Sequence, residues 1–165
     1  MTRLFFALVL IIIVLAQASA LPAIVGGGIE PNLLLVCLLV WAGFRGPEEG
    51  LIWAFGAGLV MDLVALNPLG TTCLALIPVV LIGGLARRRL FHSGIIIPLV
   101  AVVGASLAFQ VVIGVLGYFD GSAYPALVVI KLGMLTALLN MLVVPPLYLL
   151  LILLERLGVS GEAQA

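Results

Sequence analysis

Long apolar runs, separated by short connections that contain polar residues, Gly or Pro, occupy most of the chain. A helix that crosses a bilayer needs about 20 apolar residues, within a range of about 17 to 25. The pattern therefore predicts an all-α fold, a polytopic membrane protein that forms a single integral membrane domain over residues 1–165. We expect six transmembrane helices, at approximately 4–21, 31–44, 51–66, 69–86, 94–119 and 125–154.

The second run, 31–44, is short, and a run of this length is more typical of a buried or re-entrant helix than of a span. Charge placement favours keeping it. With the N-terminus inside, six spans leave no Lys or Arg in the outer loops, as the positive-inside rule describes. We therefore expect both termini in the cytoplasm. The basic residues on that side are Arg3, Arg45, Arg87, Arg88, Arg89 and Arg156.

Two segments leave alternatives open. Arg3, an apolar run and Ala18-Ser19-Ala20 imitate a cleavable signal peptide, although we expect the first helix to be retained. Without it, five spans with an outer N-terminus would also keep the arginine cluster inside. In the sixth run, Pro145-Pro146 is expected to kink the helix or break it in two.

Composition supports the membrane interpretation, since 65% of the residues are hydrophobic and 8% are charged. A soluble domain carries about 45 to 50% apolar and about 25% charged residues. Seven basic residues balance seven acidic ones, so no charged tail is left to bind nucleic acid. Cys37 and Cys73 both lie in apolar runs, which argues against a disulfide framework or a zinc site.

Catalytic and cofactor-binding motifs are missing from the sequence. The single histidine, His92, has no Ser or Cys motif that would make it the base for a nucleophile. The glycine run 26–28 precedes no Lys-Ser or Lys-Thr pair, so it does not match a phosphate-binding loop. We expect no enzymatic activity, no cofactor and no metal site.

Two charged residues lie inside predicted spans, where each costs about 2.5 to 3.5 kcal/mol on insertion scales. Asp62 precedes Pro68 by six residues and Lys131 follows Pro125 by six, so both lie at similar depth below the outer surface. We expect an intramembrane ion pair between Asp62 and Lys131. In the alternative, Asp62 caps nearby backbone and Lys131 extends outward to the interface, or pairs with Asp120.

Other polar residues suggest packing or anchoring. Gln110 and Asn140 lie well inside predicted spans, where side-chain amides commonly hydrogen-bond between helices. The cluster Arg87, Arg88 and Arg89 is expected to anchor the cytoplasmic side, with contact to membrane lipid as a further option.

The most individual part of the sequence is residues 56–70, GAGLVMDLVALNPLG, followed by an apolar helix that ends in the arginine cluster. This pattern resembles the rod-shape-determining protein MreD family, whose members have a glycine-rich helix with an aspartate, a short Pro-x-Gly turn and a helix closed by basic residues. The total length, the basic N-terminus and a short second helix introduced by Pro31-Asn32 extend the resemblance over most of the chain.

The resemblance implies a bacterial inner-membrane scaffold of the cell-elongation machinery, which supports lateral peptidoglycan synthesis and rod cell shape. Its expected partner is MreC, through the transmembrane helix and the nearby periplasmic segment of that protein. Further partners would be MreB and the elongation glycosyltransferase and transpeptidase. Apart from the resemblance, a homodimer with a second copy of the chain is left open as an option. The implied fold is similar to the six-helix substrate-binding component of energy-coupling-factor transporters. The motif residues that would shape the docking turn are Asp62, Asn67, Pro68 and Gly70.

The same implied fold leaves a substrate-binding subunit of an energy-coupling-factor vitamin transporter as an alternative function. That function requires an outward-facing cavity lined by several polar or aromatic residues, and the outer loops supply few of these. A channel or proton carrier that uses Asp62 and Lys131 would need a polar path, which Gln110 and Asn140 do not complete.

Overall fold

The structure is a computed structural model that describes residues 2–20, 29–90, 96–121 and 125–159. All regular secondary structure in this part of the chain is helical, which confirms the predicted all-α class. The elements are α1 (Thr2–Leu15) with a π-helical continuation η1 (Ala16–Ala20), α3 (Leu33–Arg45), α4 (Pro47–Val64), α5 (Thr71–Leu90), α6 (Ile96–Phe119) and α7 (Ala126–Val159).

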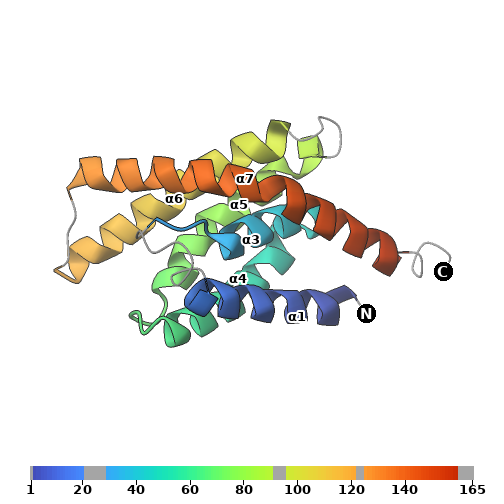
Figure 1. Cartoon of the computed structure of the whole chain (residues 1–165), viewed down its shortest axis with the longest axis horizontal. Coiled ribbons are helices and arrows are strands. Elements are labelled where there is room, and N and C mark those ends of the chain that lie inside the picture. The colour runs from blue at the N-terminus through green and yellow to red at the C-terminus, as the bar shows by residue number, and fades with distance from the viewer. Residues whose placement is uncertain (1, 21–28, 91–95, 122–124, 160–165) are drawn as a thin grey trace.

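The predicted helical ranges differ from the observed ones mainly at their ends. α4 begins at Pro47, four residues before the apolar run, because proline is favoured at the first helical position and Glu48 and Glu49 in the first turn interact favourably with the helix dipole. α7 continues without interruption through Pro145 and Pro146. Of the two predicted alternatives, a kink and a break, the structure shows the kink, because α7 bends in its C-terminal half, which contains both prolines (Figure 1).

Successive helices run in opposite directions, so the described ends of the first and last helices lie toward the same end of the bundle (Figure 1). α6 and α7 form a long antiparallel pair, and α6 also packs against α5. α1 lies at the opposite edge of the bundle, where it contacts α4, α3 and α7. The α4–α5 turn is at the end of the bundle opposite to the N-terminus (Figure 1).

α3 occupies the centre of this arrangement. It has 13 residues and rises about 20 Å, less than a bilayer's hydrocarbon core. Every residue in 34–44 is buried, and α3 contacts α1, α4, α5, α6 and α7. The run expected to be a short span is therefore also the core helix of the bundle, surrounded by the other helices.

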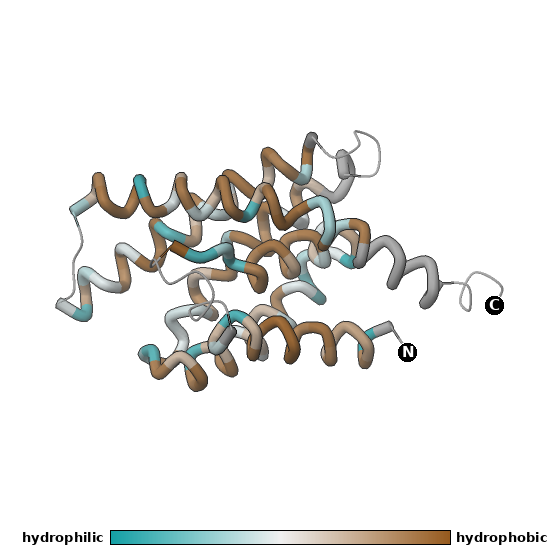
Figure 2. Tube along the Cα trace, viewed as in Figure 1, coloured by the Kyte–Doolittle hydropathy of each residue, from teal (hydrophilic) through white to brown (hydrophobic). Residues whose placement is uncertain are grey.

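The outer faces of the bundle are apolar. Figure 2 shows hydrophobic residues along most of the helix lengths, with hydrophilic residues concentrated toward the ends. Large side chains are exposed on several helices, for example Leu8, Phe55, Val100 and Leu142. Two segments, Ile97–Phe119 and Ala126–Leu149, are long and apolar enough to cross a membrane. Most of their residues are not buried inside the protein, which suits contact with lipid rather than with a water-soluble core.

Candidate functional site: the turn between α4 and α5

The Asp62 carboxylate lies fully buried near the end of α4 and accepts hydrogen bonds from the beginning of α5. Oδ2 accepts from the backbone N–H of Gly70 at 2.8 Å, and Oδ1 accepts from the N–H of Thr72 at 3.1 Å. These groups are among the N–H donors that a helix start leaves without partners, and the helix dipole there favours a negative charge. Asp62 is therefore a helix cap supplied by a neighbouring helix.

The chain between these two helices is held by its own backbone bonds. The N–H of Asn67 donates to the carbonyl of Asp62 at 3.0 Å, and Leu66 adopts a positive φ of 55°. This is a Schellman-type end of α4, a position where glycine is usual. Leucine in this conformation costs about 1 to 2 kcal/mol. The Thr71 N–H and hydroxyl both donate to the carbonyl of Pro68, which closes the turn into α5.

Two glycines of the motif have definable roles. Gly70 has a φ of 92°, which strains any side chain, and its N–H is one of the donors to Asp62. Gly58 allows α4 to approach α5 closely, since a Cβ there would lie 2.9 Å from the backbone of Cys73. The Cys73 thiol donates to the Phe55 carbonyl at 3.3 Å, beside this contact. The glycine, aspartate and Pro-x-Gly elements thus form one structural unit.

The predicted ion pair between Asp62 and Lys131 is wrong. Asp62 is fully buried with its oxygens occupied by backbone donors, whereas Lys131 is exposed on α7. Within the described part of the chain, no ion pair involves either residue. Asp62 and Lys131 were expected to lie at similar depth below the outer surface, but similar depth does not bring two side chains into contact. The alternative, in which Asp62 caps nearby backbone, matches the structure.

A second buried polar cluster involves Asn140, confirming the expected amide contact between helices. Asn140 Oδ1 accepts from the N–H of Asn32 at 2.6 Å, and Nδ2 donates to the Ser106 hydroxyl at 2.9 Å. Asn32 caps α3 by accepting from the N–H of Leu35, and it also accepts from the Gln17 side chain. This network joins η1, α3, α6 and α7. Sequence reasoning singled out Asn140 but not its partners.

The remaining predicted positions have lesser roles in the structure. Gln110 packs against α7, where an added Cβ on Gly133 would lie 3.4 Å from the Gln110 Cβ. Arg87, Arg88 and Arg89 belong to the last turns of α5, but their side chains lie outside the described structure, as does His92.

One feature that sequence reasoning missed is the apolar surface of the α4–α5 turn. Leu66 is 91% exposed, Leu69 is 68% exposed and Leu63 is 61% exposed. Leu66 combines a strained backbone with an almost fully exposed side chain. The only sequence signal was a leucine immediately before Asn67-Pro68, which alone does not reveal a positive φ.

The Asp62 carboxyl and Cys73 thiol are both engaged by backbone groups, so the turn presents a shaped apolar surface rather than a free acid or nucleophile. Among the described residues, His, Cys, Asp and Glu side chains form no group of three that could hold a metal ion. The arrangement is suited to holding α4 and α5 together and displaying Leu66.

A comparison with known protein families identifies the family of this chain. Residues 1–157 match the family model described as rod shape-determining protein MreD. The chain belongs to the MreD family. The expected resemblance is therefore confirmed over nearly the whole chain. Residues 56–70, on which the resemblance was based, contain the Asp62-capped turn. Comparison with curated proteins finds no match, and comparison with solved structures finds none either.

Proposed function

We propose that this MreD-family protein is a multi-pass protein of the bacterial inner membrane, with six transmembrane helices and cytoplasmic N- and C-termini. Antiparallel succession of the helices supports this topology, because it gathers the described arginine-bearing helix ends at one end of the bundle (Figure 1). The apolar outer faces support it further. In this topology the turn that carries Leu66 faces the periplasm.

Within the membrane the protein acts as a non-enzymatic scaffold of the cell-elongation machinery. It binds MreC through that protein's transmembrane helix and nearby periplasmic segment, and so supports lateral peptidoglycan synthesis and rod shape. MreB and the elongation glycosyltransferase and transpeptidase complete the assembly. The family match carries the role in cell shape, and the observation that favours a docking function is the exposed Leu66.

Leu66 supports docking because its backbone conformation is strained. Its positive φ costs about 1 to 2 kcal/mol relative to an ordinary backbone, and its exposed side chain makes little compensating contact with the protein. Strain that is retained in a rigid turn is typical of binding sites. Leu63 and Leu69 extend the same surface, so the site can receive an apolar segment of MreC.

The test is co-purification of MreC with Leu66→Asn in mild detergent. Asparagine tolerates a positive φ, so the substitution removes the apolar side chain while relieving backbone strain. We expect unchanged or increased thermal stability and about a tenfold loss of retained MreC, the loss expected when one buried leucine leaves an interface. The matched control is Phe119→Asn, which removes an exposed apolar side chain from the same end of the bundle.

Equal MreC retention by wild type and Leu66→Asn would reject docking at this turn. Failure of MreC to accompany even the wild-type protein would count against the scaffold function itself.

The transporter alternative finds less support. A cavity of about 320 Å³ lies between α6 and α7 near their outer ends, and among the described residues that line it Tyr118 alone has a polar side chain. Its other lining residues are Val111, Gly114, Val115, Ala126, Val129 and Ile130. Such a surface offers little to orient a polar vitamin. A small molecule retained in a native mass spectrum would favour that alternative.

A further inference from the structure

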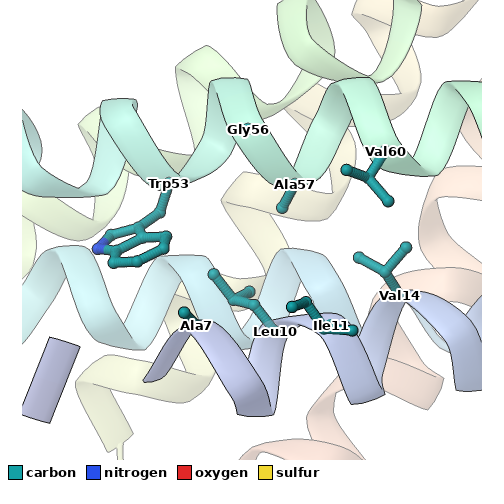
Figure 3. Close-up of a pocket in the computed structure, with 8 residues that line it drawn as sticks. All are labelled: Ala7, Leu10, Ile11, Val14, Trp53, Gly56, Ala57 and Val60. Carbon is teal, nitrogen blue, oxygen red and sulfur yellow. The ribbon is translucent and has the colours of Figure 1, made fainter. Parts of the chain in front are cut away.

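Two neighbouring cavities lie along the contact between α1 and α4. The first, of about 370 Å³, is at the end of the bundle that holds the N-terminus, and it is lined by Arg3, Arg45, Glu48, Glu49, Ile52 and Trp53. The second, of about 220 Å³, continues along the same two helices and shares Trp53 with the first. Figure 3 shows Ala7, Leu10 and Val14 of α1 facing Ala57 and Val60 of α4 across it. A polar cavity and an apolar cavity thus adjoin each other at Trp53.

The polar cavity contains side chains whose hydrogen-bonding capacity is not used. Arg45 Nε and Glu49 Oε1 are buried and have no hydrogen-bond partner in the described protein. The other Glu49 oxygen, Oε2, pairs with Arg3 at 3.3 Å, and the Arg45 guanidinium lies 5.6 Å from the Trp41 ring centroid. Buried polar groups are nearly always hydrogen-bonded, so a donor and an acceptor that the described protein leaves unpaired in one cavity are groups that a ligand can engage.

Charge defines that ligand further. Two arginines and two glutamates line the polar cavity, so it is suited to a group that carries one positive and one negative charge. Arginine binds phosphate through several parallel N–H donors, and a carboxylate accepts hydrogen bonds from an ammonium group. A phosphate joined to a primary amine satisfies both requirements. A quaternary amine such as choline lacks the N–H donors that Glu49 needs.

The apolar cavity indicates the chemistry of the remaining part of the ligand, the part that is not the headgroup. The segment from Ala7 to Val14 spans about 10 Å along α1, and the facing wall of α4 is apolar. An added Cβ on Gly56, which also lines this cavity, would meet nothing within 4 Å. A transmembrane helix is about 10 to 12 Å across with its side chains, too wide for a cavity of this volume. A single hydrocarbon chain fits it.

We propose that the α1–α4 contact binds one phospholipid with an ethanolamine headgroup, taken from the leaflet on the side of the N-terminus. Arg3 and Arg45 bind the phosphate, Glu49 accepts from the ammonium group, and one acyl chain lies between Leu10 and Ala57. The site is separate from the Leu66 surface, which lies at the opposite end of the bundle (Figure 1).

The test is native mass spectrometry of the full-length protein released from nanodiscs that contain equal amounts of phosphatidylethanolamine, phosphatidylcholine and phosphatidylglycerol. We expect one phosphatidylethanolamine to remain on the wild-type protein in preference to the other two. Glu49→Gln removes the negative charge and reduces that bound fraction about tenfold. The control Asp120→Asn removes an exposed carboxylate at the other end of the bundle and leaves binding unchanged.

The apolar part is tested by Gly56→Leu, which fills the cavity and improves the helix propensity of α4, so folding is preserved. We expect loss of the bound lipid. Gly104→Leu is the matched control, since Gly104 is also a helical glycine with open space around an added Cβ and does not line this cavity. Thermal unfolding of both variants without added lipid verifies that each remains folded.

Equal retention of phosphatidylcholine would overturn the headgroup assignment, and preference for phosphatidylglycerol would show an anion site instead. Lipid retention that survives Gly56→Leu would remove the acyl-chain site. If Gly56→Leu abolished retention of MreC while lipid binding persisted, the contact would be a protein interface rather than a lipid site.

Discussion

Two helix starts have N–H groups that buried or partly buried side chains cap, and different chemistry satisfies each of them. The start of α5 is capped by a carboxylate, since Asp62 accepts from Gly70 and Thr72. The start of α3 is capped by neutral amides, since Asn32, Gln17 and Asn140 accept from three of its N–H groups. Water is not a ready acceptor for the N–H groups of either helix start in apolar surroundings. Because an unpaired buried N–H is costly, side chains must accept these hydrogen bonds.

At the α5 start the acceptor is close in sequence to its donors, whereas at the α3 start one acceptor is far away in sequence. Asp62 is eight residues from Gly70, so one short motif encodes both donor and acceptor. Asn140 is 108 residues from Asn32, and its placement depends on the whole bundle. A charged acceptor also binds more strongly than a neutral amide. We therefore expect the α5 start to be the more rigid of the two and the α3 start to depend more on tertiary packing.

The largest effect is expected from Asp62→Ala. It leaves the Gly70 and Thr72 N–H groups buried without an acceptor and removes a charge from the α5 start, so we expect a loss of about 3 kcal/mol in unfolding free energy. Asp62→Asn keeps one acceptor oxygen and should lose about half as much. Thermal or denaturant unfolding in detergent measures both, and equal behaviour of the two variants would contradict a capping role.

A smaller effect is expected from Gly58→Ala, which places a Cβ 2.9 Å from the Cys73 backbone and forces α4 away from α5. Overpacking of this kind costs about 1 to 3 kcal/mol. Gly56→Ala, two residues earlier with open space around its Cβ, is the control and should be neutral or slightly stabilising. Similar melting temperatures for the two alanine variants would show that the helices need no close contact at Gly58.

Asn140→Leu should cost less, about 1 kcal/mol, because hydrogen bonds between membrane helices contribute modestly. The loss should be local to the start of α3, so we expect faster hydrogen exchange at the Asn32 and Leu34 amides. Gln110→Leu provides the comparison, with little change in exchange at α3. If exchange at α3 stays slow in Asn140→Leu, the network is not what holds that helix start.

The smallest effect is expected from Lys131→Met. An ion pair with Asp62 would make its removal cost about 3 to 5 kcal/mol, whereas an exposed lysine without that partner should change stability by less than about 0.5 kcal/mol. Lys131→Met combined with Asp62→Asn should show additive effects in unfolding experiments. A clear coupling energy would show that Asp62 and Lys131 interact as an ion pair. It would contradict the structure, in which the Asp62 oxygens accept from backbone N–H groups.

The sequence predicted those features that depend on local pattern. Apolar runs located every helix, and the Gly-Asp-Pro-x-Gly motif located the α4–α5 turn, because its hydrogen bonds join residues close in sequence. It did not place α3 at the centre of the bundle, since run length does not show whether other helices surround it. It paired Asp62 with Lys131 because depth can be estimated from residue counts, whereas the direction that each residue faces depends on helix packing. The positive φ of Leu66 and the partners of Asn140 depend on tertiary structure in the same way.

The central position of α3 has a consequence for how the protein is made. Its first N–H groups obtain acceptors from Gln17, already synthesised, and from Asn140, which emerges from the ribosome 108 residues after Asn32. A 13-residue segment is also too short to insert stably by itself. The second helix to be synthesised can therefore gain all of its observed hydrogen-bond partners only after the last helix has been made.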